Sequence, residues 1–332
     1  MEKQILLSIC IPTYNRAAYL HKMLDSLLPQ LKNIPEDIYE VIISDNASTD
    51  DTYSVVDICA KEYNVSIKYH RNSKNIGLDN LSYAADMARG KYSFLCGDDD
   101  ILSPNFIDTI MPYVVSEKEY GIVHWNRLEC DANGCQNKVF DPNMVENIIF
   151  FSDTKSFVEH TMRGTNFISS RIYNTKCWKE GKNIALNNIH GYERWARMVL
   201  GALTLDMPCV YYYFPLVQQR HNNHTWGNFW PYYFFVELSE IFLLISKYVD
   251  GVYEKWINEM YRYDVKARIE SIIDNKEIEF YRQHIKDFKP HLHENDYNYL
   301  ELLLYSPNPQ RVIRHRAMIE RIKKRVARTI KY

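Results

Sequence analysis

The chain has 332 residues, of which 46% are hydrophobic and 25% charged, and its formal net charge is -2. This composition excludes a largely disordered chain and provides enough apolar material for a catalytic domain and a smaller module. The seven cysteines form no C-x-x-C pair, which argues against a zinc or redox motif and indicates reduced thiols in a cytoplasmic protein. The N-terminus has no secretory pattern. The most apolar long window, residues 229–249, contains Glu237, Glu240 and Lys247, so we expect no membrane-spanning helix.

Strand and helix patterns alternate along the first 125 residues. Buried strands are predicted over residues 5–11, 41–44, 65–69 and 92–96. Helical stripes of apolar residues lie between them, over 20–31, 55–59 and 78–88. Ser103 and Pro104 then predict the start of another helix, with proline in the first helical position. Beyond residue 125 the alternation lapses, and from residue 229 the pattern is wholly helical.

This alternation predicts an α/β protein with a mostly parallel sheet flanked by helices. Ligands of such sheets bind beyond the carboxyl ends of the strands. Chemically capable residues follow three of the predicted strands: the segment Thr13–Arg16, the pair Asp45 and Asn46, and the aspartates at 98–100. We therefore expect one ligand site at this edge, with Arg16 among its residues.

Three consecutive aspartates, Asp98, Asp99 and Asp100, follow Gly97 at the end of the fourth strand. Their charges repel one another unless a cation or hydrogen-bond donors compensate them. Carboxylate oxygens suit a hard cation such as Mg²⁺ or Mn²⁺, which takes one or two protein carboxylates and completes its shell with water and phosphate. The alternative is a solvated turn whose aspartates cap the helix near Pro104.

Four segments, in order, resemble the family 2 glycosyltransferases, whose nucleotide-sugar-binding fold is called GT-A: LLSICIPTYNR, VIISDNASTDDT, NIGLDN and ARGKYSFLCGDDDILSPN. The resemblance covers residues 5 to about 125. It implies a GT-A catalytic domain over 1–225, with a nucleotide-sugar half at 1–125 and an acceptor half at 126–225, and leaves 226–332 as a helical module. It also implies an inverting, Mn²⁺- or Mg²⁺-dependent sugar transferase. The expected donor is a UDP-sugar, and the expected acceptor is a glycan or a lipid-linked glycan of bacterial surface polysaccharide synthesis.

The same resemblance assigns roles to single residues. Residues expected to line the donor site are Pro12, Thr13, Tyr14, Asp45, Asn75 and Asn80. Asp45 would bond the nucleobase, although an Asx-type turn is the alternative for an aspartate after a strand. Asp98 would contact the ribose or the edge of the metal site, and Asp99 or Asp100 would hold the cation. Gly97 stands where the family usually has an acid, which leaves the principal metal ligand open.

Transfer with inversion requires a general base near the acceptor hydroxyl. Residues 189–201, IHGYERWARMVLG, look like the family segment that carries this base, and Glu193 is the first candidate, with His190 as the second. The alternative is a surface glutamate paired with Arg197 one helical turn later. Upstream, FISSRI at 167–172 resembles the strand beneath the acceptor, where Ser169 or Ser170 would face the sugar or simply lie in a half-buried strand.

The segment 311–331 contains nine lysine or arginine residues and one glutamate, Glu320. Apolar residues recur in it near helical spacing, so an amphipathic basic helix is expected. It would either contact an anionic membrane at the inner face of the plasma membrane or pack on this subunit or another in a homo-oligomer. No zinc-finger, RNP-type or helix-turn-helix signature accompanies the charge, so no nucleic-acid partner is expected.

Two other functions have sequence patterns that can be compared. A magnesium-dependent nucleotidyl or phosphoryl transferase also places acids at strand ends. Neither G-x-x-x-x-G-K-[ST] nor G-x-G-x-x-G occurs, which argues against the commoner nucleotide folds. A non-catalytic protein that binds a nucleotide or glycan is the third alternative.

Overall fold

The computed structural model describes residues 4–130, 138–139, 148–161, 167–188, 196–220, 230–262, 265–273 and 278–329. The chain divides into two compact units, Met1–His224 and Thr225–Tyr332. Among the described residues, no helix combines the length and the apolar character needed to cross a bilayer.

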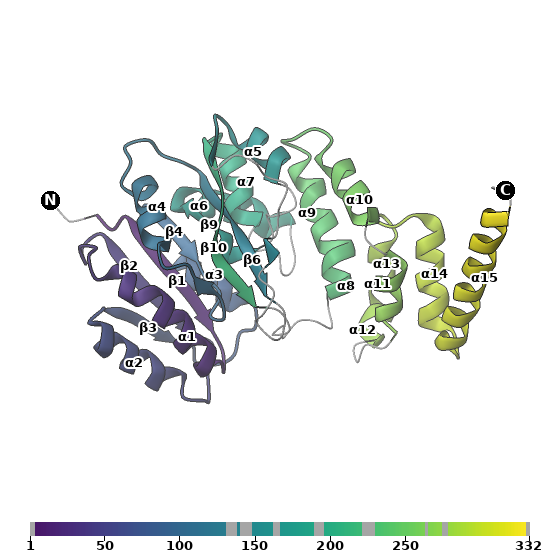
Figure 1. The fold of residues 1–332 in the computed structure, drawn as a ribbon, viewed down its shortest axis with the longest axis horizontal. Helices are drawn as coiled ribbons and strands as arrows, with labels where there is room; N and C mark the ends of the chain where they lie inside the picture. The colour runs from purple at the N-terminus through teal and green to yellow at the C-terminus, as the bar shows by residue number, and fades with distance from the viewer. Residues whose placement is uncertain are drawn as a thin grey trace. The chain divides into compact units, whose positions relative to one another are not determined.

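The described part of the first unit contains a ten-stranded sheet (Figure 1). Its strands are β1 (Leu7–Thr13), β2 (Tyr39–Asp45), β3 (Ile67–Arg71), β4 (Tyr92–Leu95), β5 (Ile101–Leu102), β6 (Ile122–Cys130), β7 (Lys138–Val139), β8 (Ile148–Phe151), β9 (Arg171–Asn174) and β10 (Cys209–Arg220). Eight of them follow the order β3-β2-β1-β4-β9-β6-β10-β5, while β7 pairs with β6 and β8 with β10.

The first four strands form the parallel part of the sheet, as the alternation predicted. β1 pairs in parallel with both β2 and β4, and β2 pairs in parallel with β3. The second part is mixed, because β9 runs antiparallel to both of its neighbours, β4 and β6. β6 and β10 are again parallel to each other. The carboxyl ends of β3, β2, β1 and β4 therefore meet at one edge.

Helices follow or separate these strands: α1 (Ala17–Leu27), α2 (Thr52–Tyr63), α3 (Asp79–Asp86), α4 (Phe106–Val114), α5 (Thr154–Thr161), α6 (Thr175–Asn188) and α7 (Ala196–Leu205). Apolar residues of α1, α2 and α4 share one core cluster with alternate residues of β1 and β2, such as Ile9 and Ile43. Ser44, the next residue in β2, points to the opposite face and bonds Asn80 of α3. Helices therefore cover both faces of the sheet, as predicted.

Two predicted helix boundaries were wrong, and a proline is involved in each. The stripe over 20–31 is an α-helix only to Leu27 and continues as a 3-10 turn over Leu28–Leu31, with Pro29 near its start, where it has no amide hydrogen to donate. Pro104 does not open the following helix. α4 begins at Phe106, whose amide donates to the carbonyl of Ser103 (3.0 Å), so Pro104 lies in a turn before the helix.

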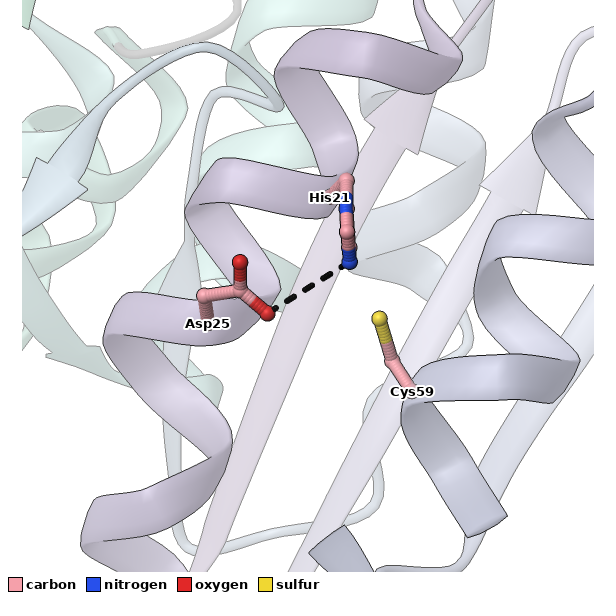
Figure 2. Close-up of side chains that lie close together, drawn as sticks. All are labelled: His21, Asp25 and Cys59. Atoms are coloured by element: carbon pink, nitrogen blue, oxygen red, sulfur yellow. Dashed lines mark ion pairs between the residues drawn. The ribbon is translucent and has the colours of Figure 1, made fainter. Parts of the chain in front are cut away.

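α1 and α2 lie side by side and bury their inner faces against the sheet. Leu20, Met23 and Leu24 of α1 are fully buried. The side chains of His21 and Asp25 emerge along the side of α1 that faces Cys59 of α2 (Figure 2). Three residues whose side chains can bind a metal ion thus meet between the two helices.

In the second unit, every element among the described residues is helical, as the sequence pattern predicted. Its elements are α8 (Trp230–Tyr232), a π-turn over Tyr233–Glu237, α9 (Leu238–Ile245), α10 (Val252–Arg262), α11 (Val265–Ser271), α12 (Ile278–Gln283), α13 (Ile285–Phe288), α14 (Glu294–Tyr305) and α15 (Pro309–Thr329). α15 is held to this unit by Arg316, whose guanidinium pairs with Glu270 of α11 (2.9 Å) and lies over the ring of Tyr299 of α14.

Candidate active site

The carboxyl edge of the parallel strands brings the aspartate run against the end of β1. Thr13 Oγ1 donates to Asp98 Oδ2 (2.7 Å) across 85 positions of sequence. The Arg16 guanidinium donates to both Asp98 Oδ1 and Asp99 Oδ2, each at 3.0 Å. Pro12 is buried in β1, whereas the neighbouring Tyr14 side chain is exposed. The expected juxtaposition of the loop after β1 with the acidic run is therefore present, with Arg16 as its charged bridge.

The three aspartates differ in their surroundings. The side chains of Asp98 and Asp99 are 6% and 20% exposed, and Asp100 is 3% exposed as a residue. The Asp99 and Asp100 carboxylates fold back over Gly97: a Cβ atom added there would lie 2.8 Å from Asp100 Oδ2 and 3.2 Å from Asp99 Oδ1. The residue that departs from the family pattern is thus one whose missing side chain leaves room for these carboxylates.

Ser169 holds the buried end of the acidic run. Its hydroxyl donates to Asp100 Oδ2 (2.5 Å) and accepts the Gly97 amide hydrogen (2.8 Å). Its own carbonyl accepts a hydrogen bond from the indole of Trp125 in β6 (3.1 Å). The segment 167–172 was expected to be a strand with Ser169 or Ser170 facing the acceptor. It is instead a 3-10 turn over Ile168–Ser170 followed by β9, and both serines are fully buried.

Burial makes the ionised form of this run costly. Burial, which the Arg16 charge partly opposes, raises the pKa of Asp98 from 3.8 to about 6. Burial and the neighbouring charge of Asp99 also raise the pKa of Asp100 well above its ordinary range. A cation beside these oxygens would relieve the repulsion, and a set of carboxylate oxygens is what Mg²⁺ and Mn²⁺ prefer. The residues present therefore fit a hard divalent ion.

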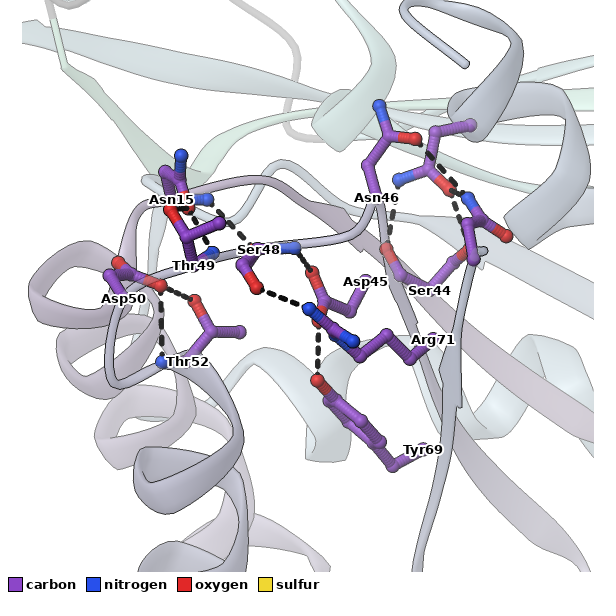
Figure 3. Close-up of polar contacts among 12 residues, drawn as sticks. Asn15, Ser44, Asp45, Asn46, Ser48, Thr49, Asp50, Thr52, Tyr69 and Arg71 are labelled. Carbon is purple, nitrogen blue, oxygen red and sulfur yellow. Dashed lines mark hydrogen bonds and ion pairs between the residues drawn. The ribbon is translucent and has the colours of Figure 1, made fainter. Parts of the chain in front are cut away.

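Asp45, at the end of β2, closes the loop that follows it (Figure 3). Its Oδ1 accepts the Ser48 amide hydrogen (2.9 Å), and its Oδ2 accepts the Tyr69 hydroxyl (2.5 Å) and lies 3.4 Å from Arg71 Nε. The Arg71 guanidinium also donates to the Ser48 carbonyl (2.7 Å). The Asx-type bond that the sequence left open is thus present. The side chains of β3 that hold Asp45 were not among the predicted site residues.

The loops after β1 and β2 fasten each other on the other side of this carboxylate. The backbone amide of Asn15 donates to Ser48 Oγ (2.9 Å), and the side-chain oxygen of Asn15 accepts the Thr49 backbone amide hydrogen (2.7 Å), as Figure 3 shows. Asn15 and Ala47 adopt positive φ values of 52° and 65°. Such values cost energy for residues other than glycine, and contacts between the two loops compensate for it.

A group of asparagines lies beside Asp45 and contains two predicted donor-site residues. Asn80 is buried and bonds both Ser44 and Asn72. Asn75 Oδ1 accepts a hydrogen bond from the Asn46 side-chain amide (2.7 Å), and the side-chain oxygen of Asn46, Oδ1, accepts the Ile76 backbone amide hydrogen (2.8 Å). Asn46 thereby fixes the loop that leads into α3. Its position directly after Asp45 was the one signal that pointed to it.

The predicted catalytic bases, Glu193 and His190, lie outside the described residues. Arg197, the alternative partner of Glu193, is nearly buried on α7, and its guanidinium lies over the ring of Trp178 of α6, 5.3 Å from its centroid. The roles of Glu193 and His190 stay predictions.

This fold, with its parallel first part, its mixed second part and its acidic run after β4, is the GT-A fold. A family model described as "Glycosyl transferase family 2" matches residues 8–182, more than half of the chain. The chain belongs to this family, as the sequence motifs indicated.

Individual relatives agree with that assignment. The abequosyltransferase RfbV of Salmonella typhimurium is 40% identical over 135 residues, which cover 40% of each chain. A GalNAc(5)-diNAcBac-PP-undecaprenol beta-1,3-glucosyltransferase of Campylobacter jejuni is 35% identical over 108 residues, covering 32% of this chain and 33% of that protein. The chain thus spans two fifths or less of the length of these curated relatives.

Among solved structures, TarS of S. aureus (residues 1–349) matches with a TM-score of 0.59 at 15% identity, covering 90% of this chain and 86% of that one. The same protein in complex with UDP-GlcNAc matches with a TM-score of 0.57, also at 15% identity and over the same share of each chain. At this identity the likeness shows the fold.

Proposed function

We propose that the chain transfers a sugar from a nucleotide diphosphate donor, a UDP-sugar, to a glycan or lipid-linked acceptor in surface polysaccharide synthesis. The observation that carries this proposal is the buried acidic run, which Thr13 and Arg16 hold from β1 and Ser169 holds from the turn before β9. The curated relatives described above, an abequosyltransferase and a glucosyltransferase of an undecaprenol-linked glycan, support the choice of substrate class.

In this proposal, the loops after β1 and β2 hold the nucleotide, and the acidic run holds the diphosphate through Mn²⁺ or Mg²⁺. Such a cation neutralises the charge that develops on the departing diphosphate. Asp99, the most exposed of the three aspartates, is our first choice as a ligand, with Asp100 as the second. Asp98 positions Arg16 and faces the ribose. The base that accepts the acceptor's hydroxyl proton is Glu193 or His190.

Transfer from a panel of UDP-sugars, measured with Mn²⁺ and with EDTA, tests the proposal. Asp99→Ala and Asp100→Ala are expected to lower the rate at least about a hundredfold, the usual effect of removing one group that stabilises the developing charge. The matched control is Asp108→Ala, which removes an exposed aspartate of α4. Turnover that is undiminished in both variants contradicts the metal role. UDP binding without any product across the panel contradicts the enzymatic role.

The basic helix α15 supports a lipid-linked acceptor. Arg311, Arg314 and Arg321 are exposed on this helix, and so are three apolar side chains, Met318, Ile319 and Ile322. Each basic residue near an anionic lipid surface contributes about 1 kcal/mol of binding energy. Co-sedimentation with phosphatidylglycerol vesicles, but not with phosphatidylcholine vesicles, is the expected result. Loss of co-sedimentation in Arg314→Glu/Arg321→Glu would link it to α15, whereas a concentration-dependent dimer without vesicle binding would assign the apolar edge to self-association.

A further inference from the structure

A second group of potential metal ligands lies between α1 and α2, on helices that begin beyond the loops of the acidic site. His21 Nε2 and Asp25 Oδ1, one helical turn apart on α1, are 3.7 Å from each other. Cys59 Sγ reaches the same point from α2, and the three ligand atoms lie within 4.8 Å of one another (Figure 2). Among the described residues, it is the one group of three or more histidine, cysteine, aspartate or glutamate side chains whose ligand atoms lie close enough together to share a metal ion.

The distances between these atoms are close to the distances between ligand atoms around a tetrahedrally coordinated ion. Zinc bonds of about 2.0–2.3 Å to nitrogen, oxygen and sulfur place neighbouring ligand atoms about 3.3–3.6 Å apart. The His21–Asp25 pair is already near that separation. Their side chains are 47% and 42% exposed, so rotation about their own bonds can bring them to an ion beside the less mobile Cys59.

The surroundings of the three residues resemble those of a ligand set. The Tyr63 hydroxyl donates to Asp25 Oδ1 (3.2 Å), the kind of outer hydrogen bond that orients a ligating carboxylate. Cys59 is fully buried, so its sulfur is held in one place, while the exposed side chains leave the fourth coordination position open to water.

We propose that His21, Asp25 and Cys59 bind a zinc-class divalent cation with water as the fourth ligand. Sulfur, imidazole nitrogen and one carboxylate oxygen select Zn²⁺, whereas the all-oxygen acidic run selects Mg²⁺ or Mn²⁺. The Cys59 thiol gives up its proton to solvent when the metal–sulfur bond forms. The bound ion joins α1 to α2 and thereby steadies the two helices that follow the loops at Thr13–Arg16 and Asp45–Asp51.

The test uses the full chain with Co²⁺ as a spectroscopic probe, in a phosphine reductant and in excess Mg²⁺ to occupy the acidic run. One equivalent of Co²⁺ is expected to give the near-ultraviolet charge-transfer band of a cobalt–thiolate bond. The band should disappear in Cys59→Ser and persist in Cys135→Ser, which removes the cysteine outside the described residues. It should also persist in Asp99→Ala, which alters the acidic run.

Zn²⁺ is also expected to raise the thermal unfolding midpoint of the wild type in excess Mg²⁺, because it binds the native state. His21→Gln and Asp25→Asn change exposed side chains, so both variants should fold. Each is expected to weaken Co²⁺ binding at least about tenfold and to reduce the zinc shift. These two variants decide the question if Cys59→Ser does not fold. Absence of the band in the wild type, its persistence in Cys59→Ser, or unchanged affinity in His21→Gln and Asp25→Asn would each overturn the proposal.

Discussion

Replacing Asp98 by asparagine tests how much the fold is destabilised by the charge of the acidic run. Asp98 is buried, and its pKa of about 6 lies above the ordinary value of 3.8. Between pH 3.8 and about pH 6, Asp98 keeps its proton in the native state, whereas in the unfolded chain it has lost it. The stabilisation from this group is therefore complete below about pH 4 and is lost as the pH rises to about 6.

The magnitude follows from the two pKa values. Their difference of about 2, at about 1.4 kcal/mol for a pKa difference of 1, gives a destabilisation of about 3 kcal/mol at neutral pH. Asparagine has the shape of the protonated aspartate and no charge. Asp98→Asn is therefore expected to unfold with a free energy about 3 kcal/mol greater than the wild type at pH 7.5, and within about 1 kcal/mol of it at pH 4.

Urea unfolding in EDTA at several pH values between 4 and 8 measures this difference. Asp108→Asn, which changes an exposed aspartate of α4, is the matched control and should follow the wild type at every pH. Adding Mn²⁺ at pH 7.5 should stabilise the wild type, by about 2.7 kcal/mol at one hundred times its dissociation constant, and stabilise Asp98→Asn less. An Asp98→Asn protein no more stable than the wild type at pH 7.5 would refute the reasoning, and so would a difference that does not change with pH.

Three further substitutions probe the surroundings of the site. Ser169→Ala removes the donor to Asp100 and the acceptor of the Gly97 amide hydrogen. We expect the free energy of unfolding in urea to fall by about 2 kcal/mol and the calorimetric Mn²⁺ dissociation constant to rise about tenfold or more. The control Ser170→Ala should leave the Mn²⁺ affinity unchanged. In Gly97→Ala, the added Cβ atom would lie 2.8 Å from Asp100 Oδ2 and would force that carboxylate away. The free energy of unfolding should fall by about 1–3 kcal/mol, and Mn²⁺ should bind more weakly. Unaltered affinity for Mn²⁺ would speak against these contacts. Asn46→Ala removes the hydrogen bonds to Asn75 and Ile76. The calorimetric UDP dissociation constant is expected to rise about tenfold. A UDP affinity equal to that of the wild type would show that this asparagine group does not contribute to the nucleotide site.

The parallel part of the fold could be predicted from sequence because its signals are local. Each strand is a short apolar run, each helix has a stripe of 3.6-residue period, and the polar residues that follow the strands necessarily share an edge. That rule predicted a shared edge for Thr13 and Asp98, and their direct contact also requires that β1 pairs with β4. Asp45 was harder, since the same side chain closes a turn and is expected to bond a base. Tyr69 and Arg71, which alternate along β3, are the residues that fix its orientation.

The contribution of Ser169 could not be predicted, because no local pattern encodes the place of β9 in the sheet. β9 comes late in the chain yet lies between β4 and β6, and it runs antiparallel to β4, with Phe94 opposite Ile172. Residues that precede β9 therefore lie beside residues that follow β4. The family resemblance indicated only that 167–172 was a strand, and the reversal of direction decided which end of it met the aspartates.

That reversal accounts for the composition of the acidic site. If β9 ran parallel to β4, the residues after it, beginning with Thr175, would lie beside the aspartates. Thr175 instead donates to the Gly90 carbonyl (2.6 Å) and bonds Ser93 (2.8 Å), at the opposite end of β4. Ser169 takes its place and ties the segment that precedes β9 to Asp100. Ser169 is therefore a single buried contact between the segment that precedes β9 and a carboxylate that follows β4, so a loss of Mn²⁺ affinity in Ser169→Ala would show that Mn²⁺ binding depends on this contact.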